Sequence, residues 1–369
     1  DLHSFPTRRS SDLGNLEKLN RYTSESATQY MKEHKKSGIV KIYSKMLFRF
    51  IRMYILQLGF LDGYEGYLLA KYSSIYTMTK YTKLREQYFR TLGKDTSLIV
   101  TTYNWPQALE ICLNSVLRQT VLPKEIIVAD DGSREDTAGL VKKIKESNPN
   151  IKIEHSWQED DGFRLSMSRN KAIAKASGKY VIIIDGDLIL ERHFIQDHIE
   201  NMEKGYFIQG SRVIISEEKS KEILKGKLPV LPEVLFEKGY KNKANTVRNR
   251  LLSKIFTKKD KKLSGIRGCN MSFFREDLVK VNGFEEKIQG WGREDSEIAV
   301  RLFNSGVGKK RLKFNGLTYH IYHKENDRSG LAENDEFLAA VIKQGKKKAE
   351  KGLDNHEGCQ FGSDKLREI

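Results

Sequence analysis

The sequence YVIIIDGD at residues 180–187 is the stretch that decides the fold of this chain. Five apolar residues in succession are typical of a strand that is buried on both faces of a parallel sheet. Two carboxylates follow, with a single glycine between them. The stretch therefore predicts a buried strand that carries acidic side chains to the edge of a sheet.

Strands and helices alternate on the N-terminal side of this stretch. We expect strands at 97–103 (SLIVTTY), 125–131 (EIIVADD) and 151–157, and helices at 106–119, 137–147 and 165–176. Such alternation predicts an α/β fold, a mostly parallel sheet with helices on both faces. Ligands of these sheets bind outside the carboxyl ends of the strands, where the polar clusters 101–104, 130–131 and 185–187 fall.

The rest of the chain divides into segments of different character. Residues 14–95 are helical, aromatic and basic, and 96–352 hold the α/β domain. Within that domain, the lysine-rich residues 217–262 predict a mostly helical insertion that forms a lid or acceptor lip, and 331–350 predict a closing helix. Residues 353–369 are left as a C-terminal tail.

The first residues, DLHSFPTRRSSDL at 1–13, show no periodicity. They resemble the conceptual translation of a sequencing adapter, and we expect them to be foreign to the natural protein. On that interpretation the chain is a fragment of something longer.

Composition narrows the class of protein. Of 369 residues 38% are hydrophobic, which is enough for a sizeable core, and the three cysteines are too widely spaced for a disulfide framework or a zinc motif. No apolar run approaches the ~18 residues that cross a bilayer. We expect a cytoplasmic protein, soluble or peripheral at the membrane. The net charge of +16 predicts a polyanionic partner: nucleic acid, an anionic membrane or a phosphorylated substrate.

The acidic end of the central strand predicts a metal site. Alternate residues of a strand point to the same side, so Asp185 and Asp187 can direct two carboxylates at one point. Hard oxygen ligands suit Mg²⁺ or Mn²⁺ on a diphosphate. Of the two histidines in TYHIYHKEND, His323 is our first choice for a further ligand and His320 the second. The alternative is a strand that simply ends in a polar turn.

Residues at the other strand ends predict a nucleotide site. Asp130 and Asp131 can accept hydrogen bonds from a base or ribose, and Tyr103 can stack on a base, although an Asp-Gly turn and a packed aromatic are the alternatives. Arg164 and Arg169, in DDGFRLSMSRN, can reach a donor diphosphate or lie on a helix surface.

The sequence GWGREDSEIAVRLF predicts an acceptor site. Gly290 lies in a flexible turn, and Trp291 offers an apolar face for a sugar ring. Glu294 and Asp295 open a helix, where its dipole favours negative charge. A carboxylate in this place can act as general base on an acceptor hydroxyl, and an ordinary acidic start of a helix is the alternative.

The ordered set VTTYN, VADDGS, DDGFRLSMSRNKAIAKASGKYVIIIDGDLIL, RGCNMSFFR and GWGREDSEIAVRLF resembles the family-2 GT-A glycosyltransferases. Its C-terminal half is similar to galactosyltransferases and chondroitin-polymerase domains, over about residues 96–352. The resemblance implies a GT-A fold and an inverting transfer from a nucleotide sugar, usually UDP-linked, to a glycan or lipid-linked glycan. The donor sugar (Gal, GalNAc, GlcNAc or Glc) and the surface glycan, such as lipopolysaccharide or capsule, are left open.

The resemblance also implies roles for particular residues. By position, Thr101, Tyr103 and Asp131 hold uridine, and Asp185 and Asp187 match the DxD metal motif. His323, in YHKE, matches the later metal histidine.

On the acceptor side, Trp291 and Asn270 are expected to contact the acceptor. Glu294 and Asp295 match the acidic pair, with Asp295 the preferred base. Arg293 replaces a second glycine of the galactosyltransferase motif, which leaves the acceptor preference open.

Residues 14–92 carry a second resemblance. The sequence LGFLDGYEGYLLAKYSSIYTMTKYTKLRE is similar to the C-terminal tail of the lipopolysaccharide-core family-2 glucosyltransferases. In those proteins the tail follows a catalytic domain, so we expect these residues to be the remnant of a preceding glycosyltransferase domain. Their mixed apolar and basic character fits an anionic membrane surface, with a buried helical subdomain as the alternative.

Other classes of protein fit the sequence less well. A nucleotidyltransferase favours a Gly-rich loop bearing Lys or Arg after the first strand, and a dinucleotide oxidoreductase needs GxGxxG there, whereas VTTYNWPQ has neither. A basic nucleic-acid-binding protein agrees with the charge, but no zinc-finger spacing or RNP-like motif supports it. We therefore expect no nucleic-acid partner.

Overall fold

The computed structural model describes residues 12–226, 238–324 and 327–356. Most of the expected foreign segment, the middle of the lysine-rich insertion and the end of the tail lie outside these residues. The chain divides between Leu92 and Gly93 into two compact units, which we describe separately.

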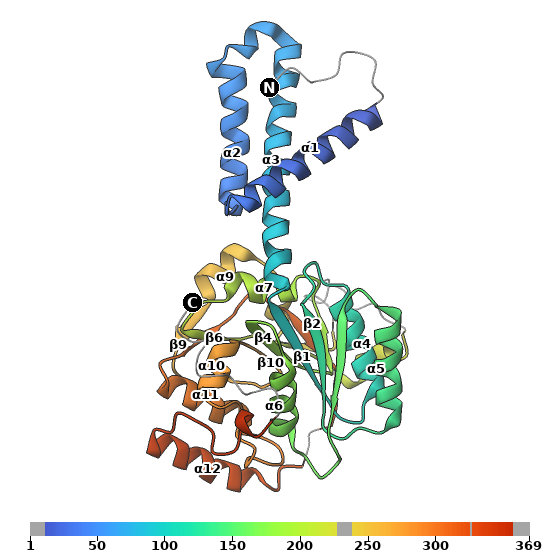
Figure 1. Cartoon of the computed structure of the whole chain (residues 1–369), viewed down its shortest axis with the longest axis vertical. Helices are drawn as coiled ribbons and strands as arrows, with labels where there is room; N and C mark the ends of the chain where they lie inside the picture. Colours follow the sequence, from blue (N-terminus) through green and yellow to red (C-terminus); the bar gives the residue numbers. More distant parts are fainter. Residues whose placement is uncertain (1–11, 227–237, 325–326, 357–369) are drawn as a thin grey trace. The chain divides into compact units, whose positions relative to one another are not determined.

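The N-terminal unit is helical. It contains α1 (Asp12–Lys32), α2 (Ile39–Ile51), the π-helical turn η1 (Arg52–Leu56), the 3₁₀ turn η2 (Gly59–Asp62) and α3 (Gly63–Gly93) (Figure 1). Lys83 of α3 donates to the Asn20 carbonyl of α1 at 2.7 Å, and Arg49 of α2 donates to Ser73 of α3 at 2.7 Å. Polar bonds thus join both other helices to α3.

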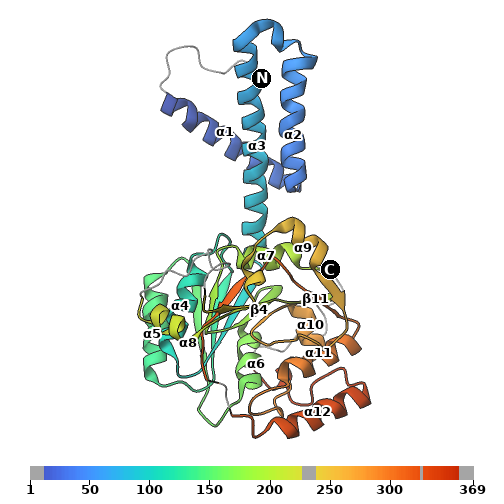
Figure 2. The same ribbon diagram turned by 180° about the vertical axis from the view of Figure 1, so that it is seen from behind.

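A large sheet forms the centre of the second unit (Figures 1 and 2). Its strand order is β3-β2-β1-β4-β10-β6-β11-β9. The strands, in chain order, are β1 (Thr96–Thr102), β2 (Glu125–Asp130), β3 (Lys152–Trp157), β4 (Tyr180–Asp185), β6 (Tyr206–Gln209), β9 (Lys258–Asp260), β10 (Asn270–Phe274) and β11 (Gly308–Arg311). The first four in space are parallel, whereas β10 runs antiparallel to β4 and β6. The expected α/β fold is confirmed, with a mixed sheet beyond β4 that the strand–helix alternation did not predict.

Helices cover both faces of this sheet. On one face lie α6 (Leu165–Lys175), α10 (Arg275–Lys280) and α11 (Glu294–Asn304), and their apolar residues share one core with β1, β4 and β10. On the other face lie α4 (Pro106–Leu117) and α5 (Glu135–Ser147) (Figure 1). The remaining helices are α7 (Phe194–Asn201), α8 (Glu217–Leu224), α9 (Arg250–Phe256) and α12 (Leu331–Gln344), with short 3₁₀ turns at Lys243–Thr246 and Leu353–Asn355.

A second, four-stranded sheet completes the unit. Its order is β5-β12-β7-β8, from β5 (Leu188–Leu190), β12 (Thr318–His320), β7 (Val213–Ile215) and β8 (Tyr240–Lys241). Two strands of the lysine-rich insertion join sheets, β8 here and β9 in the large sheet. The expectation of a mostly helical insertion missed both strands, because their partners β7 and β11 lie far away in the sequence.

Candidate active site

A cleft of about 1650 Å³ opens at the carboxyl ends of β1 and β4. Its walls come from the ends of these strands, the turn that precedes α11, the second sheet and the segment before α12. The predicted site residues that line it are Thr101, Tyr103, Asp131, Arg169, Asp185, Asp187, Gly290, Trp291, Glu294, Asp295, His320 and His323. The fold therefore brings together side chains that are more than two hundred residues apart in the sequence.

Three of these side chains form a group suited to a metal ion. The ligand atoms of Asp187, His320 and His323 all lie within 4.8 Å of one another. Asp187 Oδ2 is 3.4 Å from His320 Nε2 and 3.2 Å from His323 Nε2. Its other oxygen, Oδ1, is buried and has no hydrogen-bond partner among the described residues. A buried carboxylate oxygen without a partner is costly, so the group fits a bound cation.

Two backbone contacts position this group. Gly186 N donates to the Thr101 carbonyl at 2.7 Å, and a Cβ on Gly186 would lie 2.7 Å from the same oxygen, so only glycine permits this approach. Ile321 N donates to the Asp187 carbonyl at 3.0 Å, which ties the turn after β4 to the end of β12. The histidines thus reach Asp187 through the pairing of β12 with the segment after β4.

The pKa values of the two histidines are shifted in opposite directions. The hydrogen bond with Asp187 raises the pKa of His323, whereas burial lowers the pKa of His320. Burial acts to raise the pKa of Asp187, but the His323 hydrogen bond and the charges of both histidines outweigh it and lower that pKa. The carboxylate is therefore held ionised, and neutral His320 is available as a ligand.

Asp185 lies outside this group, although we expected it among the metal ligands. Its Oδ1 accepts a hydrogen bond from Thr101 Oγ1 at 2.9 Å and lies 3.3 Å from Arg169 Nη2. The strand ends at Asp185, so the side-chain alternation on which the expectation rested does not extend to Asp187. His320, our second choice, takes the place in the group that Asp185 was expected to fill.

Arg169 connects the metal side of the cleft to the acidic pair. The guanidinium, buried on α6, lies 3.3 Å from Asp185 Oδ1 through Nη2 and 3.3 Å from Glu294 Oε1 through Nη1. The ring of Phe284 packs 5.1 Å from its Cζ atom. An arginine with both ends engaged holds the two carboxylates at a fixed separation.

The acidic pair at the start of α11 also lines the cleft. Burial, and then the charge of Asp295, raise the pKa of Glu294 to about 7, and Arg169 offsets only part of this. Asp295 Oδ2 accepts the Gly268 N–H at 2.9 Å, and its Oδ1 accepts the Ser296 hydroxyl at 3.1 Å. Both Asp295 oxygens are thus oriented by neighbouring groups.

The residue before this pair has an unusual backbone. Arg293 has φ 78°, in the left-handed region that favours glycine. The galactosyltransferase motif that this stretch resembles has a glycine at this position. Arg293 Nε hydrogen-bonds to Asp335 Oδ1 on α12, which engages the side chain while the backbone is strained.

The comparisons with known proteins agree with this geometry. Residues 97–281, half of the chain, match the family described as glycosyl transferase family 2. The chain belongs to that family. Residues 252–324 also match the N-terminal domain of galactosyltransferase. The expected family and its galactosyltransferase-like C-terminal half are confirmed, and neither match reaches residues 14–92, whose resemblance stays a prediction.

Several polysaccharide synthases are similar to this glycosyltransferase. The chondroitin synthase of Pasteurella multocida (strain Pm70) is 28% identical over 240 residues, which cover 61% of this chain and 24% of the relative. The hyaluronan synthase of Pasteurella multocida is 29% identical over 243 residues, 62% of this chain and 24% of the relative. The chain therefore matches only about a quarter of the length of these relatives.

Among solved structures, the crystal structure of GalNAc-T7 with UDP, GalNAc and Mn²⁺ has a similar fold. The TM-score is 0.50 at 18% identity, over 67% of this chain and 47% of that one. At this identity the likeness concerns the fold alone.

Three predicted site residues of this glycosyltransferase do not line the cleft. Asp130 is buried and accepts hydrogen bonds from Ser133 N and from the His155 ring. Arg164 pairs with Asp161 Oδ2 at 2.9 Å. Asn270 is buried on β10, where its amide donates to the Ser211 carbonyl at 3.2 Å. These contacts engage the three side chains within the fold, and their roles toward the substrates stay predictions.

The expected uridine residues show two different environments. Tyr103 is 46% exposed, and its hydroxyl donates to Asp160 Oδ2 at 3.1 Å. Asp131 is buried, and it accepts hydrogen bonds from Gln158 Nε2 at 2.5 Å and Arg164 N at 2.8 Å. Burial raises the pKa of Asp131 to about 6. An exposed ring beside a buried carboxylate fits a heterocyclic base with N–H donors.

The sequence analysis did not predict several cations that line the cleft, among them Arg212 and Arg267. Arg212 follows β6, lines the cleft and interacts electrostatically with Asp185 and Asp187. Its Nε is buried without a hydrogen-bond partner among the described residues. Arg267, before β10, lines the same cleft. Neither stands in a strand-end cluster, and a basic residue after the run YFIQ was the only signal for Arg212.

Proposed function

We propose that this glycosyltransferase moves a sugar, with inversion, from a UDP-sugar to a hydroxyl of a growing surface glycan. The supporting observation is that the Asp187–His320–His323 group and the Glu294–Asp295 pair face one cleft. The similar structure named for UDP, GalNAc and Mn²⁺ and the polysaccharide synthases among the relatives agree with this reaction. The transferred sugar (Gal, GalNAc, GlcNAc or Glc) is left to experiment.

Asp187, His320 and His323 would hold a divalent cation. When bound, the cation neutralises negative charge on the departing diphosphate. Two of the three ligands are imidazoles, and Mg²⁺ prefers an all-oxygen shell. Of the two ions expected, Mn²⁺ is therefore favoured over Mg²⁺.

The donor nucleotide would lie between the ends of β1 and β2. Tyr103 offers a face for the uracil ring, Asp131 accepts its N–H, and Thr101 orients Asp185 toward the ribose. The Arg212 guanidinium beside Asp185 and Asp187 would contact the diphosphate, which leaves Arg169 to hold Asp185 and Glu294 in place.

Asp295 would be the general base. Its Oδ2 is oriented by the Gly268 N–H, and it would take the proton of the acceptor hydroxyl as that oxygen bonds to the anomeric carbon. The bond from this carbon to the diphosphate breaks on the opposite side, which inverts the configuration. Trp291, after the turn at Gly290, would stack on the acceptor sugar.

The helical unit would place the enzyme against an anionic membrane. Most of the exposed large apolar side chains in the described chain belong to this unit, among them Val40, Leu47, Leu56 and Leu61. Lys41 and Lys45 are exposed on the same helix as two of them. No helix among the described residues has the length and apolar character of a membrane span. Peripheral binding at the inner face is the arrangement that we propose.

A panel of UDP-sugars, read out as UDP release, tests this function. We expect release with one or a few donors, more with Mn²⁺ than with Mg²⁺ and none in EDTA. Asp187→Ala should lower the rate at least 100-fold, because both histidines lose their shared partner, and Glu146→Ala on α5 is the matched control.

The Asp295→Asn variant tests the general base independently of donor binding. It should abolish transfer and leave UDP affinity unchanged, since the amide keeps the shape but cannot take a proton. Full activity of wild-type protein in EDTA would exclude the metal role, and persistent transfer by Asp295→Asn would point to Glu294 as the base.

A further inference from the structure

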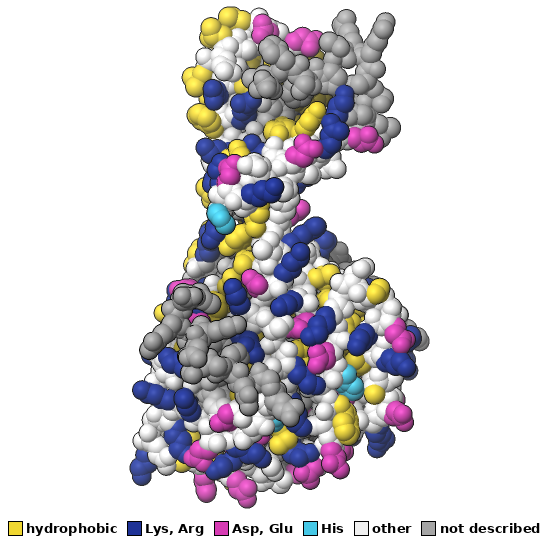
Figure 3. Space-filling model, viewed as in Figure 1, with side chains coloured by type: hydrophobic (Ala, Val, Ile, Leu, Met, Phe, Trp, Pro, Cys, Tyr) yellow, Lys and Arg dark blue, Asp and Glu magenta, His cyan; other side chains and the backbone are white. Residues whose placement is uncertain are grey.

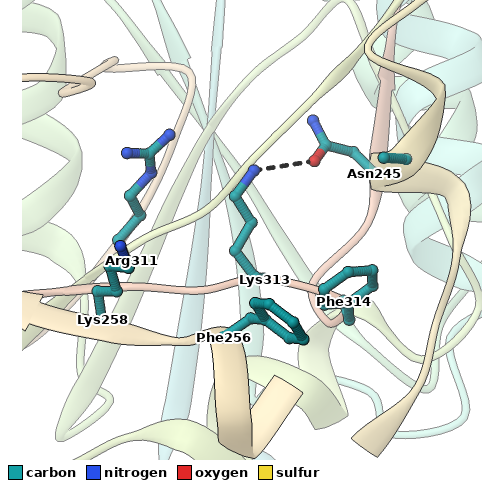
Figure 4. A pocket seen from close by; sticks show the side chains of 7 residues that line it. Asn245, Phe256, Lys258, Arg311, Lys313 and Phe314 are labelled. Atoms are coloured by element: carbon teal, nitrogen blue, oxygen red, sulfur yellow. Dashed lines mark hydrogen bonds between the residues drawn. The ribbon is translucent and has the colours of Figure 1, made fainter. Parts of the chain in front are cut away.

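A second pocket lies at the β9 edge of the large sheet. It encloses about 340 Å³ and is lined by Ala244, Asn245, Phe256, Lys258, Arg311, Lys313 and Phe314 (Figure 4). Among the described residues, its lining contains three cations and no carboxylate. No assigned role of the transferase uses this pocket.

Two of these cations, Lys258 and Arg311, belong to the paired strands β9 and β11. Three rungs pair Lys309 with Asp260, Lys310 with Lys259, and Arg311 with Lys258. Lys309 lies 3.2 Å from Asp260 Oδ1 in the first rung.

In the second rung Glu203 compensates both lysines, at 3.3 Å from Lys310 and 2.5 Å from Lys259. The third rung sets Lys258 opposite Arg311, and the carboxylates that pair with the other two rungs, Asp260 and Glu203, form no ion pair with either residue. Like charges directly opposite in a ladder are destabilising. A bound anion would turn this unfavourable rung into a favourable one.

Lys313 adds a third charge to the same space. It is partly buried, and its Nζ donates to Asn245 Oδ1 at 3.2 Å, a neutral partner (Figure 4). Burial, and then the charges of Arg311 and Arg267, lower its pKa. Positive charge is thus concentrated here, and no carboxylate in the described part of the chain pairs with these three side chains.

Two aromatic rings form the apolar side of the pocket. Phe256 and Phe314 are 5.5 Å apart at 62°, and Phe256 is 50% exposed. Phe314 has φ 57°, a conformation that is costly for a bulky residue and frequent at binding sites. Cations beside one exposed and one half-buried aromatic ring suit a ligand that has both an anionic group and an apolar ring face, as an acidic sugar has.

The pocket adjoins the catalytic cleft. Arg267 lines the cleft and acts electrostatically on Lys313 in the pocket. Asn245 lines the pocket, and its amide donates to the carbonyl of Arg212, a cleft residue, at 3.0 Å. Arg267 and Arg212 thus link the lining of the pocket to the lining of the cleft.

We propose that this pocket is a secondary subsite that binds an anionic group, a carboxylate or a phosphate, on the acceptor glycan. The proposal rests on the proposed glycan acceptor and extends it to an acidic or phosphorylated chain. Lys258, Arg311 and Lys313 hold the anion, and Phe256 and Phe314 lie against the sugar ring.

Binding of hexagalacturonate to the full chain tests this subsite, with the methyl-esterified hexamer as a neutral ligand of the same shape. Wild-type protein should bind the acidic hexamer at least tenfold more tightly. Lys258→Ala/Arg311→Ala should weaken its binding by about tenfold or more for each charge removed. Lys142→Ala/Lys143→Ala removes the same charge at the opposite edge of the sheet and should leave binding unchanged.

Inorganic phosphate distinguishes the two anions. Its competition with the acidic hexamer, together with tighter binding of a phosphorylated oligosaccharide, would assign the subsite to phosphate, and the reverse order would assign it to carboxylate. Equal binding of the acidic and neutral hexamers, or unchanged binding by Lys258→Ala/Arg311→Ala, would overturn the proposal.

An assay of UDP release distinguishes a failure of this proposal from a failure of the proposed function. The double variant keeps the cleft intact and should hydrolyse UDP-sugar at the wild-type rate. Absence of UDP release from wild-type protein would count against the transferase function, whereas loss of hexamer selectivity alone would count against the subsite.

Discussion

At the scale of single residues, the cleft depends on charges that share partners. Asp187 is shared by two histidines, and Arg169 is shared by Asp185 and Glu294. A change in one of these groups therefore alters the protonation or the position of another.

Glu294 gives this coupling a measurable pH dependence. Its pKa is raised from the ordinary 4.5 to about 7 in the folded protein, so the folded state binds more protons than the unfolded state between these values. Stability should therefore fall as pH rises through this window, by on the order of 2 to 3 kcal/mol from this group. Glu294→Gln should remove that loss, so its stability relative to wild type should increase between pH 5 and 8.

Urea unfolding in EDTA at a series of pH values measures this difference. The exposed Glu146→Gln on α5 is the control, for which the difference from wild type should not vary with pH. A difference for Glu294→Gln that stays constant from pH 5 to 8 would show that this carboxyl is not the titrating group.

At the scale of elements, the start of α11 holds the acidic pair at a strained residue. Arg293 has φ 78°, and its side chain contributes only an exposed pair with Asp335. Arg293→Gly should relieve a strain of about 1 kcal/mol, which exceeds what an exposed ion pair contributes. Arg293→Ala keeps the strain and loses the pair, so it should be no more stable than wild type.

Thermal unfolding of wild type, Arg293→Gly and Arg293→Ala compares the backbone strain with the ion pair. We expect Arg293→Gly to have the highest Tm of the three proteins. UDP release should change little, because Glu294 and Asp295 keep their partners. A glycine variant that melts below the alanine variant would show that the positive φ stores no strain.

At the scale of the whole molecule, basic and apolar side chains occur on both units, and Figure 3 shows lysine and arginine spread over the face in view. The helical unit is the one with the most exposed large apolar side chains. Each Lys or Arg near an anionic membrane contributes about 1 kcal/mol. Lys41→Glu/Lys45→Glu should therefore weaken binding to phosphatidylglycerol vesicles by more than tenfold, measured by co-sedimentation.

Lys142→Glu/Lys143→Glu makes the same charge change on α5 and should leave vesicle binding nearly unchanged. A chain that begins at Gly93 should lose vesicle binding and keep UDP release, because the second unit contains the entire cleft. Equal co-sedimentation of all these proteins would argue against a membrane role for the helical unit.

Local sequence pattern was sufficient to predict the parallel half of the large sheet. The strands β1, β2, β3 and β4 and the helices between them lie within a few residues of their expected bounds. Apolar runs of strand length, separated by helical periodicity, carry this information without reference to distant residues. Local pattern also singled out the acidic pair at 294–295, which begins α11, and Asp187, which lies in the turn after β4.

The sequence by itself thus determined the fold class, the family and twelve of the residues that line the cleft, among them the acidic pair and Asp187. Only the tertiary structure separated Asp185 from Asp187, brought His320 to the latter, and added Arg212 and the β9–β11 pocket. Each of these features depends on pairing between segments far apart in the chain, as between β12 and β5 or β9 and β11. Such pairing is decided by the packing of the whole unit, and it leaves no periodic pattern in the local sequence.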